Sequence, residues 1–203
     1  SAERFKVYTQ RNLHKLPQIS SLSKQQQFEI QVVANVLPFR VNQYVAENLI
    51  DWSQVPDDPM FRLVFPQREM LEENDYGIMS EALKKGKSKP ELKEQARIIR
   101  AKLNPNPADQ MELNLAELDG KTLEGVQHKY PETVLFFPAR GQVCHSYCTF
   151  CFRWPQFVGD RTLRFASTSP STLTRYLIQQ PQVSDVLITG GDPMVMQALH
   201  LND

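Results

Sequence analysis

The sequence predicts an α/β protein, in which a mainly helical first part precedes a β/α series. Helix signals recur through residues 1–125, whereas from about residue 126 short apolar runs flank a helical pattern. A strand, a long loop, a helix and a second strand, in that order, favour a parallel sheet. The sequence therefore divides into two predicted domains, 1–125 and 126–203.

The first part carries several helix signals. Ser23 and Gln26 have the spacing of a capping box, and the apolar residues that follow have helical periodicity as far as Pro38. Further helices are predicted at residues 41–49, at residues 76–86 and from Lys89-Pro90 onward. Residues 51–70 contain three prolines and are predicted to be a surface loop, and residues 104–109 (NPNPAD) are predicted to be a linker.

The second part contains two short runs that predict strands. Residues 133–137 (TVLFF) and 183–189 are apolar without alternation, as is typical of parallel strands covered on both faces. Ser169 precedes a helical pattern between them, and a further helix is predicted to begin at Met194.

Composition excludes several classes of function. Lysine plus arginine equal aspartate plus glutamate at 23 each, so the formal net charge is zero and gives no sign of nucleic-acid binding. The apolar runs are far shorter than the roughly 20 residues of a membrane span. The first residues, SAERFKVYTQR, lack the apolar segment of a secretory signal. We therefore expect a cytoplasmic protein without membrane or nucleic-acid partners.

All three cysteines of the chain lie in one short stretch, CHSYCTFC at residues 144–151. An odd, clustered set argues against a disulfide scaffold and for a metal site. Thiolates are soft ligands that select zinc, copper(I) or iron–sulfur clusters. A structural zinc ion needs a fourth ligand, for which the sequence offers His145, His128 or His200. A cubane cluster held by three thiolates instead keeps one iron open.

A second motif, ITGGDP at residues 188–193, follows the second predicted strand, just as the cysteines follow the first. By itself this motif has the composition of an ordinary turn. Consecutive parallel strands are usually neighbours, so we expect both motifs to meet at one edge of the sheet. Open α/β sheets and barrels place their chemistry at that edge.

The C-x3-C-x2-C spacing, with Phe150 before the last cysteine, resembles the signature of the radical S-adenosylmethionine superfamily. One branch, the lysine 2,3-aminomutase family, is similar in further stretches: LPFR at 37–40, KYPETVLFF at 129–137, CFR at 151–153 and TGGDP at 189–193. The resemblance implies a partial (β/α) barrel of radical-SAM type, truncated after its second strand and preceded by a helical region.

The resemblance also implies a set of site residues. The ligands of a [4Fe-4S] cluster would be Cys144, Cys148 and Cys151, and its fourth iron would chelate S-adenosylmethionine. The contacts to S-adenosylmethionine would be Phe150 beside the adenine, Arg153 at the methionyl carboxylate, and Gly190, Gly191 and Asp192 at the methionyl amino group.

The implied reaction starts with reductive cleavage of S-adenosylmethionine to a 5′-deoxyadenosyl radical, which abstracts hydrogen from an amino acid. Pyridoxal phosphate would carry that substrate while its amino group migrates to the neighbouring carbon. The family's pyridoxal lysine lies downstream of these residues, so no lysine is assigned here. The implied partners are a small amino acid or a protein lysine, as on elongation factor P, and an electron donor such as flavodoxin or ferredoxin. Self-association is also expected.

Two alternatives stay open at this point. One is another radical-SAM enzyme that does not use pyridoxal phosphate. The other, from a different class, is a zinc-binding module without catalysis.

Overall fold

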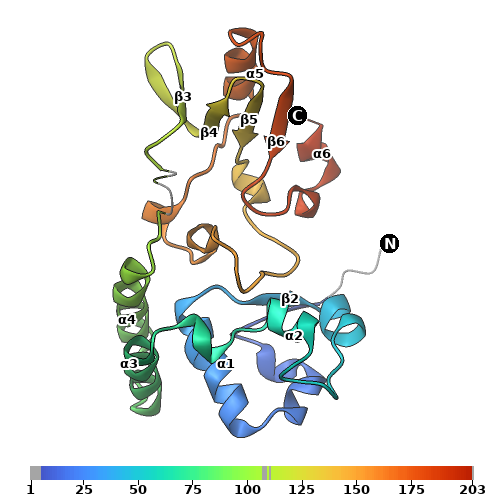
Figure 1. Cartoon of the computed structure of the whole chain (residues 1–203), viewed down its shortest axis with the longest axis vertical. Coiled ribbons are helices and arrows are strands. Elements are labelled where there is room, and N and C mark those ends of the chain that lie inside the picture. Colours follow the sequence, from blue (N-terminus) through green and yellow to red (C-terminus); the bar gives the residue numbers. More distant parts are fainter. Residues whose placement is uncertain (1–5, 107–108, 110, 203) are drawn as a thin grey trace. The chain divides into compact units, whose positions relative to one another are not determined.

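The computed structural model describes residues 6–106, 109 and 111–202. The chain forms two compact units, residues 1–105 with 145–151, and residues 106–144 with 152–203, and each is described here by itself. Their elements are labelled in Figure 1. The predicted boundary between residues 125 and 126 lies inside a strand, β4 (Lys121–Tyr130). None of the helices in the described ranges has the length and apolarity needed to cross a bilayer.

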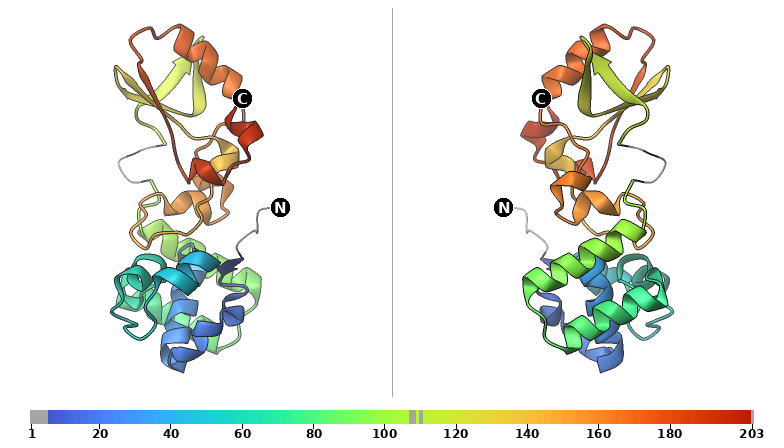
Figure 2. Two further views of the ribbon diagram at one scale, coloured as in Figure 1. Left: turned by 90° about the vertical axis from the view of Figure 1, so that its right-hand side faces the viewer. Right: turned by 90° about the vertical axis from the view of Figure 1, so that its left-hand side faces the viewer.

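The first unit is mainly helical. Its α-helices are α1 (Lys24–Val36), α2 (Pro59–Val64), α3 (Glu73–Lys84) and α4 (Lys89–Lys102). A short antiparallel pair, β1 (Val7–Thr9) and β2 (Arg40–Asn42), places Tyr8 opposite Val41. Single turns complete it: η1 (Leu13–Lys15), η2 (Pro17–Ser21), the π-helix η3 (Val45–Leu49) and η4 (Arg68–Met70). Helices α1, α3 and α4 pack against one another, as both views in Figure 2 show.

The predicted helix starts at Ser23 and Lys89 are confirmed. The Gln26 amide donates to Ser23 Oγ at 3.1 Å, while Gln26 Oε1 accepts from the Ser23 amide at 2.9 Å. Helix α4 starts in the same way, because the Ser88 amide donates to Glu91 at 2.9 Å, with Pro90 in the first turn. These local bonds provide partners for backbone amides that an uncapped helix N-terminus would leave without hydrogen bonds.

Two predictions in this unit need correction. The helix predicted at residues 41–49 begins only at residue 43, because β2 continues to Asn42, and its residues 45–49 form the π-helix η3. Residues 51–70 are not simply a loop, because they contain α2. Asp58 caps that helix by accepting from the Phe61 amide at 2.7 Å, and Pro59 occupies the first turn, where a proline costs no hydrogen bond.

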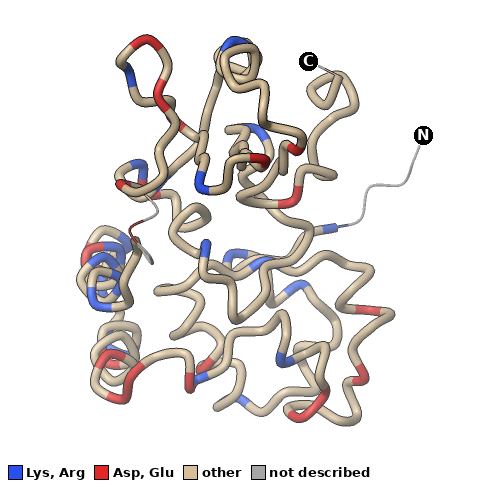
Figure 3. The backbone as a smooth tube through the Cα atoms, turned by 45° about the horizontal axis from the view of Figure 1, so that its top comes forward, with Lys and Arg blue, Asp and Glu red and all other residues tan. Residues whose placement is uncertain are grey.

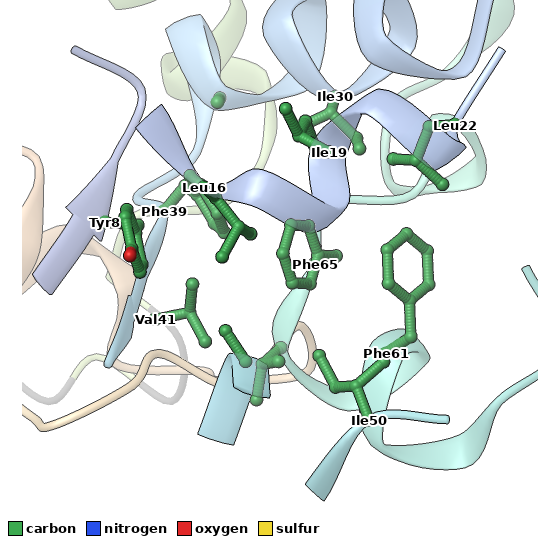
Figure 4. Packing of buried hydrophobic residues seen from close by; sticks show 13 residues of the cluster. Tyr8, Leu16, Ile19, Leu22, Ile30, Phe39, Val41, Ile50, Phe61 and Phe65 are labelled. Carbon is green, nitrogen blue, oxygen red and sulfur yellow. The ribbon is translucent and has the colours of Figure 1, made fainter. Parts of the chain in front are cut away.

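Aromatic side chains form the centre of the first unit's core (Figure 4). The Phe61 and Phe65 rings stack with centroids 4.6 Å apart, and the Phe39 ring lies 5.2 Å from that of Phe65. Phe65 is completely buried. Full burial of a side chain of this size stabilises the fold by about 1.5–3 kcal/mol. The α2 segment is therefore held by its apolar face.

Charged residues of both signs are spread along the backbone, as Figure 3 shows. Most of the ion pairs are exposed, such as Lys85–Glu81 at 2.9 Å. One differs, because the Asp75 side chain is only 6% exposed and binds Lys102 at 2.6 Å. This pair joins α3 to α4 and gives a buried carboxylate the partner it needs.

The second unit is built on a four-stranded sheet in the order β3-β4-β5-β6. Its elements are β3 (Leu115–Leu118), β4, β5 (Thr133–Phe136), α5 (Pro170–Ile178), β6 (Asp185–Ile188), α6 (Ala198–Leu201) and the single turns η6 (Ala139–Gly141), η7 (Trp154–Phe157), η8 (Arg161–Leu163) and η9 (Pro193–Val195). Strands β5 and β6 run parallel in a register that pairs Phe136 with Ile188. Both predicted strands and their parallel pairing are confirmed.

Other expectations for this region are wrong. Strands β3 and β4 form an antiparallel hairpin where the sequence appeared mostly helical, so the sheet is mixed. Strand β6 is not covered on both faces, since Leu187 is 54% exposed and β5 is its one neighbouring strand among the described residues. After the GGD motif the chain forms η9 first, and α6 begins at Ala198 instead of Met194. Within the predicted linker, Pro107 and Ala108 lie outside the described residues.

A partly buried hydrogen bond joins α5 to the sheet. His128 Nε2 lies 3.1 Å from the Pro131 carbonyl, to which it donates, so Nδ1 accepts from the Tyr176 hydroxyl at 2.6 Å. Tyr176 is nearly inaccessible, and burial raises the pKa of its phenol above the usual value of about 10.

We predict that Tyr176→Phe lowers the free energy of unfolding at pH 8 by about 1 kcal/mol, the net value of one hydrogen bond. A phenol whose pKa is raised by folding contributes its full stabilisation of the folded state below about pH 10. This contribution falls as the pH rises through the raised pKa. The difference between the two proteins therefore shrinks above pH 10. Urea unfolding at pH 8 and pH 10.5 measures both effects, with the exposed Tyr130→Phe as control. A constant difference across this range would contradict the assignment.

Candidate cofactor site

In the second unit, the segments that follow β5 and β6 are bonded together. The Thr189 amide donates to the Phe136 carbonyl at 2.8 Å, which extends the parallel pairing by one residue. Gln142 Nε2 then donates to the Thr189 carbonyl at 3.2 Å, and the Asp192 amide donates to the Val143 carbonyl at 2.9 Å. The GGD turn therefore contacts the residues immediately before Cys144. The segments that leave the two predicted strands therefore meet, whereas the meeting of the cysteines themselves with the GGD turn stays a prediction.

Both glycines of the turn are required by this approach. A Cβ on Gly191 would lie 2.5 Å from the Val143 nitrogen and closer still to the Gly141 carbonyl oxygen. A Cβ on Gly190 would lie 2.5 Å from Gln142 Nε2, and the φ of +104° at Gly190 is one that other residues rarely adopt. Gly191 thus allows two stretches of backbone to meet, and Gly190 leaves room for the Gln142 side chain.

Two further predicted contacts have partners inside the protein. Asp192 Oδ1 accepts from the Met194 amide at 2.9 Å and so caps the turn η9. The Arg153 guanidinium carbon lies 4.3 Å from the centroid of the buried Phe137 ring and 5.0 Å from that of Phe152. Stacking of this kind holds a guanidinium through its flat face and does not use its N–H donors. The proposed contacts of Asp192 and Arg153 with a cofactor stay predictions.

Residues 145–151 belong to the first unit, where they lie against β2 and α2. The Tyr147 amide donates to the Arg40 carbonyl at 2.9 Å, and the Asn42 amide donates to Ser146 Oγ at 3.2 Å. The Thr149 amide and hydroxyl donate to the carbonyls of α2, at 2.8 and 2.9 Å. Phe150, predicted to lie beside adenine, is 77% exposed.

The three thiols fit the requirements of a soft-metal site in their chemistry. None forms a disulfide, and all are partly buried. The Cys151 amide donates to the Cys148 carbonyl at 3.1 Å, so these two residues are joined by one tight turn. Cys144 lies in the second unit and Cys148 and Cys151 in the first. Among the described side chains, no group of three or more His, Cys, Asp or Glu residues is gathered as a metal site.

Two features of this region had escaped the sequence analysis. Gln142 Oε1 is buried and lacks a hydrogen-bond partner among the described residues, although the amide is fixed by its bonds to Pro138 and Thr189. A cavity of about 330 Å³ in the second unit is lined by residues that include Arg140, Ser167 and His200. The lining residues come from three stretches far apart in the chain, within 136–140, 167–170 and 196–200, so no local pattern indicated the cavity.

No protein-family model matches the chain. It is 28% identical, over 90% of its length, to a protein of Aquifex aeolicus named "Putative L-lysine 2,3-aminomutase". The L-lysine 2,3-aminomutases of Methanococcus maripaludis and Bacillus subtilis are 23% and 22% identical over 87% and 94% of the chain. The chain is a relative of the L-lysine 2,3-aminomutases.

These relatives are much longer than the chain. It spans 38% of the Aquifex protein and 32% of each of the other two. The similarity therefore supports an α/β protein of the radical-SAM type. It relates the chain to one part of the longer aminomutase sequences.

We predict that Gly191→Ala separates the GGD turn from the residues before Cys144, because the clash is with backbone atoms that cannot rotate away. Overpacking of this kind costs about 1–3 kcal/mol of unfolding free energy. Urea unfolding and amide exchange at Asp192 measure the loss of stability and of the bond to Val143.

Gly77→Ala is the matched control, since Gly77 lies inside α3 and a Cβ there meets nothing within 4 Å. Alanine should stabilise that helix by about 0.5–1 kcal/mol. Equal effects of the two substitutions would show that the contact at Gly191 has no special importance.

Proposed function

We propose that this chain is the cluster-binding part of a radical S-adenosylmethionine enzyme of the aminomutase type. The observation that carries the proposal is the bond between Asp192 and Val143, which fixes the GGD turn to the residue before Cys144. The C-x3-C-x2-C spacing and the similarity to three L-lysine 2,3-aminomutases support the same proposal.

One group of residues would hold the iron–sulfur cluster, and a second group would hold S-adenosylmethionine. Cys144, Cys148 and Cys151 would supply three thiolates to a [4Fe-4S] cluster, which leaves one iron for S-adenosylmethionine. When bound and reduced, the cluster supplies the electron that cleaves the carbon–sulfur bond of S-adenosylmethionine.

The second group would bind S-adenosylmethionine itself. Arg153, held by the Phe137 ring, offers a planar set of donors suited to a carboxylate. Asp192 offers a carboxylate suited to the methionyl ammonium. The neighbouring Gly190 and Gly191 have no side chains, so neither adds bulk beside that carboxylate. The unsatisfied Gln142 oxygen next to Gly190 adds an acceptor that fits a nearby donor. Phe150 would lie against the adenine.

The activity of the whole protein follows as a broader proposal. It would be migration of an amino group on an amino acid, with lysine as the substrate named for the relatives and pyridoxal phosphate as a further cofactor. A (β/α) barrel, a flavodoxin- or ferredoxin-like electron donor, self-association and a cytoplasmic location belong to the same proposal.

Iron and acid-labile sulfide analysis of the anaerobically reconstituted chain tests the cluster. We predict about four irons per chain. Each of the variants Cys144→Ala, Cys148→Ala and Cys151→Ala should lose most of this iron, because a cluster with one open iron depends on all three thiolates. Electron paramagnetic resonance of the reduced protein should change when S-adenosylmethionine is added.

The same experiment separates the alternatives. One bound zinc in place of iron would indicate a zinc-binding module. A cluster whose spectrum ignores S-adenosylmethionine would remove the radical-SAM proposal. A responsive cluster in a full-length relative that acts without pyridoxal phosphate would favour the other class of radical-SAM enzyme.

We predict that Asp192→Asn weakens S-adenosylmethionine binding by at least tenfold while the fold is retained. Asparagine caps a turn as well as aspartate does, so the bond to Met194 survives and the negative charge is lost. Isothermal titration of the reconstituted protein measures the affinity, and iron content shows that the cluster is intact.

Asp160→Asn is the matched control. Asp160 caps η8 in the same way, by accepting from the Thr162 amide at 2.9 Å, and it is not a proposed cofactor contact. Unchanged affinity in both variants would limit Asp192 to its role as a turn cap.

A further inference from the structure

The carboxyl end of α2 leaves two carbonyl groups without partners from its own helix. In a longer helix the Arg62 carbonyl would accept from residue 66, but residue 66 is proline and has no N–H. The Leu63 carbonyl would accept from Gln67, whose amide instead faces Met70 Sδ at 3.3 Å. The extended backbone of Phe65 ends the helix before the proline.

Thr149 supplies both missing donors from a segment far along the chain. Its amide donates to the Leu63 carbonyl at 2.8 Å, and its hydroxyl donates to the Arg62 carbonyl at 2.9 Å. A single residue thus caps α2 from outside and is fixed by two bonds that differ in direction. Any residue except proline would supply the amide, but the second bond requires a hydroxyl.

The location of Thr149 gives this cap a consequence for the cysteines. Thr149 follows Cys148 directly and lies inside the turn that the bond from the Cys151 amide to the Cys148 carbonyl closes. The preceding residues are fixed to β2 through Tyr147 and Ser146. The turn with two of the three thiols is therefore held by the first unit just before Cys148 and again at Thr149, within the turn.

We infer that Thr149 is a positioning residue, which presets the turn between Cys148 and Cys151 on the end of α2 before any cluster binds. The role in cluster binding rests on the proposed function, whereas the cap itself does not. A ligand turn that is ordered in advance loses less conformational entropy on binding metal and releases it more slowly.

Thr149→Val tests the inference, because it keeps the branched shape and removes the hydroxyl. In the metal-free chain, amide exchange of the peptide containing residues 145–151 should become about fivefold to tenfold faster, as expected for the loss of one hydrogen bond. In the reconstituted chain, iron transfer to a chelator should accelerate by a similar factor. Thr149→Ser retains the hydroxyl and should restore both rates to within about twofold.

Thr174→Val is the matched control, since Thr174 is exposed on α5 and its hydroxyl lies 3.4 Å from the Pro170 carbonyl. Urea unfolding of all variants shows whether global stability is unchanged. Equal exchange in parent and Thr149→Val would overturn the cap, and faster exchange with unaltered iron release would overturn the positioning role. A parent chain that takes up no iron would instead reject the proposed function, while the exchange data still decide the cap.

Discussion

The parallel pairing of β5 with β6 is the constraint on which the candidate site depends. Its register sets Phe136 opposite Ile188, so both strands end at the same level and the segments that leave them meet at once. The next bonds, from Thr189 to Phe136 and from Asp192 to Val143, continue that pairing beyond the strands. A slip in the register of β6 would carry the GGD turn away from the residues before Cys144.

Sequence reasoning succeeded where the physical cause is local or follows from topology. The capping box at Ser23 is formed by residues three apart, so its pattern is visible in the sequence, and the helix start at Lys89 was predicted from the neighbouring Pro90. The pairing of β5 with β6 was predicted from the rule that consecutive parallel strands are neighbours. Sequence reasoning failed at the β3–β4 hairpin. The turn there is Asp119-Gly120, in which both residues have a positive φ, and this is a typical two-residue hairpin turn.

Other features were inaccessible from the sequence because they depend on distant partners. The bond from the Thr149 hydroxyl to the Arg62 carbonyl joins residues 87 positions apart, and it exists because Pro66 leaves that carbonyl unpaired. The exposure of β6 likewise depends on which strands surround it. An unbroken apolar run predicts a strand, but it does not say whether both faces of that strand are covered.

The structure also changes the explanation of the GGD motif. The sequence analysis attributed its glycines to close approach of a cofactor, yet a Cβ at Gly191 would first meet the backbone of Gly141 and Val143. Asp192 similarly caps a turn before it meets any ligand. Each of these residues has a structural reason that is complete without a cofactor. The same holds for Thr149, whose two bonds complete the end of α2. The GGD turn in the second unit and the cysteine turn in the first are therefore each ordered by bonds of their own, within the unit to which each belongs.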